Sequence, residues 1–246
     1  MKKYLILSAS FIILLLTFLG CKKENLCDCF KSTGSETIIY RDLTNSFDTV
    51  LMKDKLDVYL IEDTIDKIEI HGGKHLVNLV HTDVANNKLT ITNNNKCNFV
   101  RSYKRRIKVY VHVTNLKSIV QNGVGNLYCV NDITSDSLTY QIFNSGDLHL
   151  KVNNLFLRGG VNGMGDIYAE GTTLIHNSNI KGEGFLFAES LNTQTSDLIM
   201  KTSGTSKITA NSQIILTLTQ SGNVYYHGNP SVIQTSITGS GKLIPF

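Results

Sequence analysis

Two aspartates occupy the same place in neighbouring sequence repeats, an arrangement that can bind a hard cation. Asp147 follows the turn NSG and Asp166 follows NGMG, with Asn126 in the equivalent place one repeat earlier. Calcium prefers such oxygen ligands. The next repeat, however, has Phe185 at this position, and the calcium-binding pattern G-G-x-G-x-D does not occur. Short polar side chains also cap bends, so the sequence favours turn chemistry and predicts no metal site.

A second acidic pair, Glu170 and Glu189, is separated by one repeat and could in principle cleave a glycosidic bond. Glycoside hydrolysis needs two carboxylates about 5–10 Å apart in a cleft. Asp166 is a third acid of this kind, and Arg158 and Lys181 are the cations that could assist. Both glutamates, however, follow a small strand residue, as ordinary outward polar residues do. The sequence therefore predicts a non-enzymatic protein, with a polysaccharide-active enzyme as the alternative.

A cluster of cations lies in the segment RSYKRRIK. Its members are Arg101, Lys104, Arg105, Arg106 and Lys108. They could contact an anionic polysaccharide or a lipid phosphate. The alternative is a solvated loop leading into an edge strand, where charge discourages strand pairing, and the pattern favours this loop. The formal net charge of +4 is too modest to indicate nucleic acid as a partner.

The chain begins MKKYLILSASFIILLLTFLGC, with the charged start and apolar middle of a secretory signal. Its ending resembles a bacterial lipobox, although Phe18 and Leu19 depart from the usual residues. The resemblance implies cleavage before Cys21 and lipid attachment to that cysteine. An uncleaved anchor helix is the alternative, but the apolar run is short for a membrane span of about 20 residues. We expect residues 1–20 to be a signal peptide and 21–36 a polar, lipidated tether.

Three further cysteines follow the expected lipid site. Cys27 and Cys29 are too close together to bond easily to each other, so we expect a disulfide from either of them to Cys97. An oxidising compartment beyond the inner membrane permits such a bond. Zinc is the alternative, but it needs four ligands of compatible spacing. Cys129 belongs to the repeats and is expected to be a buried thiol.

Residues 37–120 read as a less regular region of short β-strands. Segments 67–71 and 88–92 alternate apolar and polar residues, and 107–113 is the clearest strand. Gly72-Gly73 marks a turn after the first of these strands. After the signal segment, no stretch of twelve residues has a helical period.

Residues 121–246 repeat one short phrase, a polar turn with glycine followed by an aliphatic residue. The turns are NGVGNL, NSGDL, NGMGDI, KGEGFL, SGTSKI, QSGNV and GSGKL. The aliphatic residues are Leu127, Leu148, Ile167, Leu186, Ile208, Val224 and Leu243. Their mean spacing of about 19 residues indicates a solenoid, and it is too short for a strand plus a full helix. The sequence therefore predicts an all-β fold with a right-handed parallel β-helix. We expect glycine to supply a positive φ at each corner.

Residues two places beyond each aliphatic should share its inward face, because strand side chains alternate. These residues are Cys129, Leu150, Ala169, Ala188, Ala210 and Tyr226. Tyr226 is expected to close the core near the end of the rod, while Tyr168 and Tyr225 could stack on sugars. His149, His176 and His227 lack metal-like spacing and are expected to lie outward or in loops.

These repeats, together with the segments FDTVLMKDKLDVYLIED and NNKLTITNNNKCNFVRSYKRRIKVYVHV, resemble the auto-transporter adhesin head domains called GIN domains. Such domains are common in envelope proteins of Bacteroidetes. The resemblance covers roughly residues 37–246 and implies an all-β solenoid outside the cytoplasm, with no catalytic residues or cofactor to carry over.

From these features together we expect an outer-membrane lipoprotein of the cell envelope that binds or adheres through its β-helix surface. The expected partner is a glycan, an envelope protein or a host surface protein. A purely structural envelope component is a further alternative.

Overall fold

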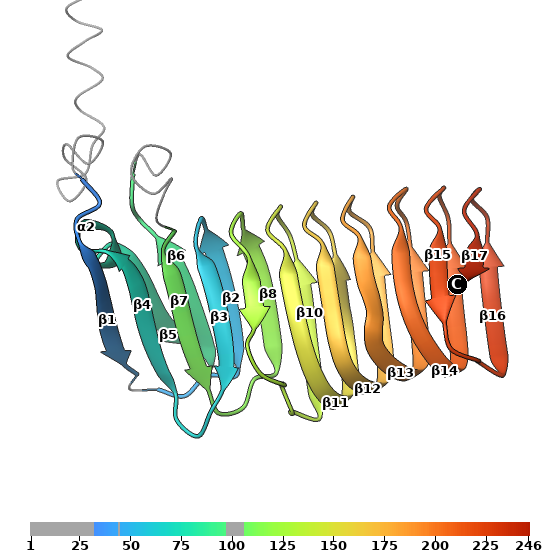
Figure 1. Cartoon of the computed structure of the whole chain (residues 1–246), viewed down its shortest axis with the longest axis horizontal. Coiled ribbons are helices and arrows are strands. Elements are labelled where there is room, and N and C mark those ends of the chain that lie inside the picture. Colours follow the sequence, from blue (N-terminus) through green and yellow to red (C-terminus); the bar gives the residue numbers. More distant parts are fainter. Residues whose placement is uncertain (1–31, 44, 97–105) are drawn as a thin grey trace, which may run out of the picture.

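The computed structural model describes residues 32–43, 45–96 and 106–246. They form a nearly all-β rod of stacked coils, with β1 at one end and the C-terminus at the other (Figure 1). This arrangement, a solenoid of about 7 turns with a mixed-direction N-terminal part, confirms the predicted fold class. No helix in the described ranges is long and apolar enough to cross a membrane.

The elements, in chain order, are β1 (Glu36–Asp42), β2 (Thr49–Asp54), β3 (Asp57–Glu62), β4 (Lys67–Gly73), α2 (Lys74–Val77), β5 (Val80–Ala85), β6 (Lys88–Asn93), β7 (Lys108–Val113), β8 (Ser118–Gly123), β9 (Leu127–Cys129), β10 (Ser137–Ile142), β11 (Leu148–Val161), β12 (Ile167–Ile180), β13 (Leu186–Met200), β14 (Ser206–Leu218), β15 (Val224–His227), β16 (Val232–Ile237) and β17 (Leu243–Pro245).

The coils build two parallel sheets, because β11 to β14 are long and bend around the rod. The first sheet contains β7, β3, β9, the N-terminal halves of β11 to β14, β15 and β17. The second sheet contains β6, β2, β8, β10, the C-terminal halves of β11 to β14, and β16. Equivalent residues of successive coils therefore lie side by side along the rod.

The N-terminal end of the rod is built differently. The coil formed by β2 and β3 lies between the β6–β7 coil and the β8–β9 coil, so chain order and spatial order differ. Next to the β6–β7 coil, β1 pairs antiparallel with β4, and β5 pairs antiparallel with β6. The short helix α2 contacts β1 and β4 and buries Leu76 and Val77. Antiparallel strands and a helix thus cover the core at this end.

Most of the predicted inward aliphatics are fully buried, including Leu148, Ile167 and Leu186. In one coil the predicted inward aliphatic, Ile208, lies two residues beyond the position equivalent to Leu186. Leu186 pairs with Ser206, not Ile208, and Ile208 is the partner of Ala188. Ser206 is wholly buried, and its hydroxyl contacts the Met200 sulfur at 3.1 Å. The prediction fails here because serine replaces the aliphatic residue in this coil, so the next aliphatic along the chain falls at the wrong position of the repeat.

The expected role of the corner glycines was wrong. Among the described glycines, positive φ values occur at Gly34, Gly171 and Gly228, none of which precedes a repeat aliphatic. Instead, a Cβ on Gly165 would collide with the carbonyl oxygen of Gly146, and one on Gly146 would collide with that of Gly125. Glycine is therefore required because successive coils approach each other too closely for a side chain.

Candidate functional site

Six rings form one continuous stack on the outer side of the first sheet, which we call the aromatic ladder. Its members are Tyr110, Tyr59, Tyr128, His149, Tyr168 and Phe187. Neighbouring ring centroids are 4.6–5.0 Å apart and their planes are within 19° of parallel. This separation follows the distance between hydrogen-bonded strands, and stacked pairs of this kind each contribute about 0.5–1.5 kcal/mol beyond burial.

The aromatic ladder uses its ring faces internally. Tyr168 lies between His149 and Phe187, so both of its faces are covered, although 36% of the residue is exposed. At one end Lys207 lies 6.0 Å from the centre of the Phe187 ring. The expectation that Tyr168 stacks on sugars is therefore not supported by this geometry, because only ring edges reach solvent. Tyr226 packs partly buried against the end of the core, as expected.

A groove of about 280 Å³ runs beside the aromatic ladder, between it and a row of charged side chains. Each of the two candidate catalytic carboxylates has a lysine partner, with Glu170 3.8 Å from Lys151 and Glu189 3.6 Å from Lys207. A bulge also shifts the register, so that Glu170 pairs with Ser190 and not with Glu189. The geometry therefore does not favour a matched pair of catalytic acids.

Cys129 lines the same groove, and the residue as a whole is only partly buried, although a buried thiol is expected from the sequence. Desolvation nevertheless raises the pKa of the thiol to about 12. The group therefore stays protonated at neutral pH and is a poor nucleophile.

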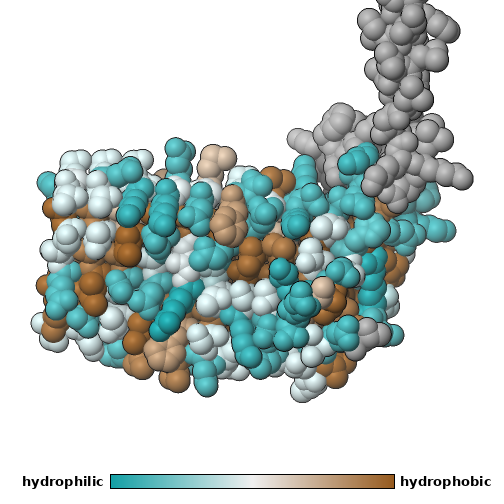
Figure 2. Space-filling view, turned by 180° about the vertical axis from the view of Figure 1, so that it is seen from behind, coloured by the Kyte–Doolittle hydropathy of each residue, from teal (hydrophilic) through white to brown (hydrophobic). Residues whose placement is uncertain are grey.

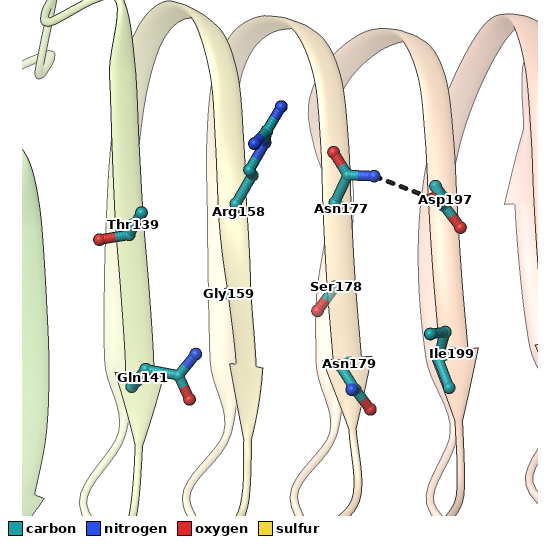
Figure 3. A pocket seen from close by; sticks show the side chains of 9 residues that line it. All are labelled: Thr139, Gln141, Arg158, Gly159, Asn177, Ser178, Asn179, Asp197 and Ile199. Atoms are coloured by element: carbon teal, nitrogen blue, oxygen red, sulfur yellow. Dashed lines mark hydrogen bonds between the residues drawn. The ribbon is translucent and has the colours of Figure 1, made fainter.

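The second sheet carries a polar depression of about 350 Å³, which we call the amide hollow. Its walls come from four adjacent strands, β10 to β13, and Figure 3 shows side chains such as Arg158 and Asn177 around a bare strip of backbone at Gly159. The buried Ser178 instead points inward, where its hydroxyl accepts from Tyr140. The lining residues are Thr139, Gln141, Arg158, Gly159, Asn177, Ser178, Asn179, Asp197 and Ile199. Gly159 contributes backbone to the floor, and a Cβ there would collide with the carbonyl oxygen and the buried ring of Tyr140, its partner in the preceding coil.

Several polar groups of the amide hollow are not consumed by contacts within the protein. The Asn177 amide donates to the Asp197 carboxylate at 2.9 Å, but the Asn179 side-chain oxygen is buried without a hydrogen-bond partner. The Arg158 guanidinium lies 5.3 Å from the centre of the Phe156 ring, and within the described ranges no carboxylate lies within ion-pair distance of it. Amides, a carboxylate and a guanidinium together offer both donors and acceptors to a polar ligand.

The aspartates with possible calcium-binding character have a structural role. The Asn126 side-chain oxygen accepts the backbone N–H of Asp147 at 3.1 Å, and the Asp147 carboxylate accepts that of Asp166 at 3.0 Å. The Asp166 carboxylate accepts the N–H of Phe185 at 2.8 Å, and the series stops because phenylalanine has no acceptor. We call this series of one asparagine and two aspartates the Asx ladder. Among the described residues no group of three or more histidine, cysteine or acidic side chains could hold a metal ion.

His176 was expected to lie outward, but it points into the core and only 1% of it is exposed. Its Nε2 lies 2.9 Å from the Tyr140 hydroxyl, which also donates to Ser178 at 2.9 Å. Its Nδ1 has no partner. Burial lowers the pKa of His176 to about 4, so the ring is neutral at physiological pH. A bend in β12 places the residue inward, and simple alternation from the strand start misses this.

Of the predicted anionic-ligand residues, Arg106 and Lys108 lie in the described part of the chain. Lys108 lies over the Tyr59 ring, with its Nζ 5.8 Å from the ring centre. Arg106 is 60% exposed and its guanidinium lies 3.2 Å from the Asp57 carboxylate, which is only 8% exposed. Part of its charge is thus used to neutralise an internal acid. The other predicted site residues lie outside the described part of the chain, namely Arg101, Lys104, Arg105, the predicted lipidation site Cys21, and the disulfide candidates Cys27, Cys29 and Cys97.

A stack of parallel coils with polar outer grooves defines a β-solenoid protein with surfaces suited to binding. The family model described as "Putative auto-transporter adhesin, head GIN domain" matches residues 46–230, and the chain belongs to this family. This agrees with the resemblance seen in the sequence.

Solved structures with the same fold include proteins from Bacteroides and Parabacteroides species. A "putative adhesin" from Bacteroides fragilis is 24% identical, with a TM-score of 0.76, over 86% of this chain and 98% of the other. A "Putative lipid binding protein" from Parabacteroides distasonis is 17% identical, with a TM-score of 0.66, over 87% and 98%. A "putative adhesin" from Parabacteroides merdae is also 17% identical, with a TM-score of 0.62 over the same shares. Comparison with curated proteins gave no match.

Proposed function

We propose that this protein is a lipid-anchored, non-enzymatic binding protein of the cell envelope that holds a glycan in the amide hollow. The observation that carries the proposal is the unused hydrogen-bonding capacity of Arg158 and Asn179 beside an open backbone floor. Saccharide hydroxyls donate and accept hydrogen bonds, as the amides of the hollow do. Its position on a long, flat sheet would admit an extended chain across several coils.

Membership of an adhesin-type family supports the adhesive role and a place in the envelope. The lipid anchor rests on the sequence, in which a short apolar run ends at Gly20-Cys21. Several acyl chains on Cys21 would give a stable attachment, since each buried methylene adds about 0.8 kcal/mol.

Glycan arrays probed with the mature chain carrying Cys21→Ser test the binding role. We expect binding to at least one polysaccharide, and at least tenfold weaker binding by the Arg158→Ala and Asn179→Leu variants. Lys151→Ala is the matched control, because it removes a cation from the groove on the other sheet and should leave binding unchanged. Equal binding by all four proteins would refute the assignment to the hollow, and cleavage of a polysaccharide would refute the non-enzymatic role.

Fractionation of cells tests the anchor. The unmodified chain should sediment with the outer membrane, whereas Cys21→Ser should move the protein to the soluble envelope fraction. Protease treatment of intact cells then distinguishes the two faces of the membrane, because only a surface-exposed rod is digested. Recovery of Cys21→Ser in the outer-membrane fraction would contradict lipid anchoring.

A further inference from the structure

The last coil of the rod leaves two strand edges open. Within the described residues, β16 pairs with β14 alone and β17 pairs with β15 alone. Thr238 donates its backbone N–H to Leu218, so the even-numbered residues of β16 direct their backbone groups to β14. By alternation, the N–H and C=O groups of Ile233, Thr235 and Ile237 point to the free edge.

The core is also uncovered at this end. Ile233 and Ile237 occupy the same inward positions as Ile214 and Leu218 of the preceding coil, which are fully buried. In the last coil these isoleucines are 45% and 40% exposed, and all six residues of β16 are exposed. The apolar ladder thus ends on a surface where water meets core side chains, which solenoids usually cover with a polar terminal repeat.

The two ends of the rod differ in charge as well. From Gly228 to Phe246, Lys242 carries the only charged side chain, although exposed edges are usually protected by charge. Figure 2 shows few strongly hydrophilic residues over the coils at the C-terminal end and many near the opposite end. There, β1 contains Glu36, Arg41 and Asp42, and α2 with antiparallel strands covers the core.

We infer that the C-terminal coil is an interface for the same coil of a second copy of this chain. A two-fold axis through the middle of β16 would place the two free edges antiparallel, so that each open N–H meets an open C=O. The exposed isoleucines of both copies would then cover each other, and no like charges on β16 would oppose the contact. A head-to-tail contact is disfavoured, because the edge strand at the other end, β1, carries the charged residues Glu36, Arg41 and Asp42.

Such a pair joins two rods end to end, with the N-terminal ends farthest apart. If Cys21 carries the lipid proposed above, the two anchors would lie at opposite ends of the doubled rod. This consequence rests on the proposed anchor, whereas the pairing itself does not.

Sedimentation equilibrium of the mature chain carrying Cys21→Ser tests the pairing. We expect a concentration-dependent rise from monomer to dimer with no larger species, because an isologous contact closes on itself. Thr235→Pro removes a free-edge N–H while keeping the ladder to β14, and Ile233→Lys places charge at the two-fold contact. Either variant should weaken dimerisation at least tenfold.

Ile38→Lys provides the matched control, since Ile38 is likewise 45% exposed on an edge strand, but at the opposite end. It should leave dimerisation unchanged. Thr235→Cys should form a disulfide-linked dimer under mild oxidation, whereas Ile38→Cys should not. A protein that stays monomeric up to millimolar concentration, an open-ended polymer, or a dimer that is disrupted by Ile38→Lys alone would each overturn the inference. Glycan binding by a monomer would leave the proposed function intact.

Discussion

The outer surfaces of the two sheets differ in how their side chains repeat from coil to coil. On the first sheet, successive coils repeat one type of side chain, and the aromatic ladder covers its own ring faces. On the second sheet, the row Thr139, Arg158, Asn177 and Asp197 changes type at each coil, and much of its hydrogen-bonding capacity stays open. In a solenoid, repetition therefore serves stability, while variation within a row leaves chemistry available for binding.

The corner glycines test the stability side of this comparison most severely. Gly165→Ala should destabilise the fold by about 3 kcal/mol or more, because its Cβ collides with the Gly146 carbonyl and the coils must separate. Chemical denaturation monitored by circular dichroism measures the loss. Gly204→Ala is the control within the same row, because the nearest atom to its Cβ lies 3.1 Å away. Equal losses in the two variants would show that coil spacing does not impose glycine.

The buried histidine beneath the amide hollow sets the pH dependence of that region. His176 has a pKa of about 4 when folded and a value near 6.5 when unfolded. Its contribution is unchanged above pH 6.5, but stability falls as pH decreases toward 4, because only the unfolded state takes up the proton. The loss should reach about 3 kcal/mol near pH 4.

Denaturation midpoints measured between pH 4 and 7 check this expectation. In His176→Gln the acid-induced loss should shrink, because glutamine does not titrate and can still meet the Tyr140 hydroxyl. A variant with the same pH slope as the original chain would assign the effect to other groups.

The aromatic ladder should yield a smaller loss of stability and no loss of binding. Tyr59 stacks between Tyr110 and Tyr128 at 4.8 and 5.0 Å, so Tyr59→Ala removes two stacked pairs and should cost about 2 kcal/mol. Tyr40→Ala should cost less than about 0.5 kcal/mol, since that ring is 68% exposed on the edge strand β1. Thermal unfolding compares the two. If Tyr59→Ala is fully folded yet binds glycan more weakly, the first sheet also takes part in binding, and the proposed difference between the two sheets is wrong.

Part of this difference between the two sheets could be predicted from the sequence. The repeated turns predicted the solenoid, and once the coils are aligned, Tyr128, His149, Tyr168 and Phe187 fall at one position between the inward residues. Tyr59 and Tyr110 could not be added, because the β2–β3 coil is inserted out of chain order.

The amide hollow could not be predicted from the sequence, because its row has no constant residue type. Glycine is needed at position 159 in its floor because the buried Tyr140 ring fills the space where a side chain would lie, a contact between different coils. The shifted assignment at Ser206 and the inward position of His176 have a similar origin. Both depend on local departures from a regular period, which the average spacing hides.

The Asx ladder gives the smallest expected effect on stability, and it tests whether its carboxylates serve only the fold or also bind a metal ion. The Asp166 carboxylate accepts the Phe185 N–H, so Asp166→Ala should cost about 1 kcal/mol, the net value of one such hydrogen bond. Asp166→Asn keeps the acceptor oxygen and should be nearly neutral in stability. Thermal unfolding with and without calcium distinguishes the roles. A calcium-dependent rise in Tm that Asp166→Asn abolishes would show that this ladder binds metal, and repetition along the rod would then serve ligand binding as well as stability.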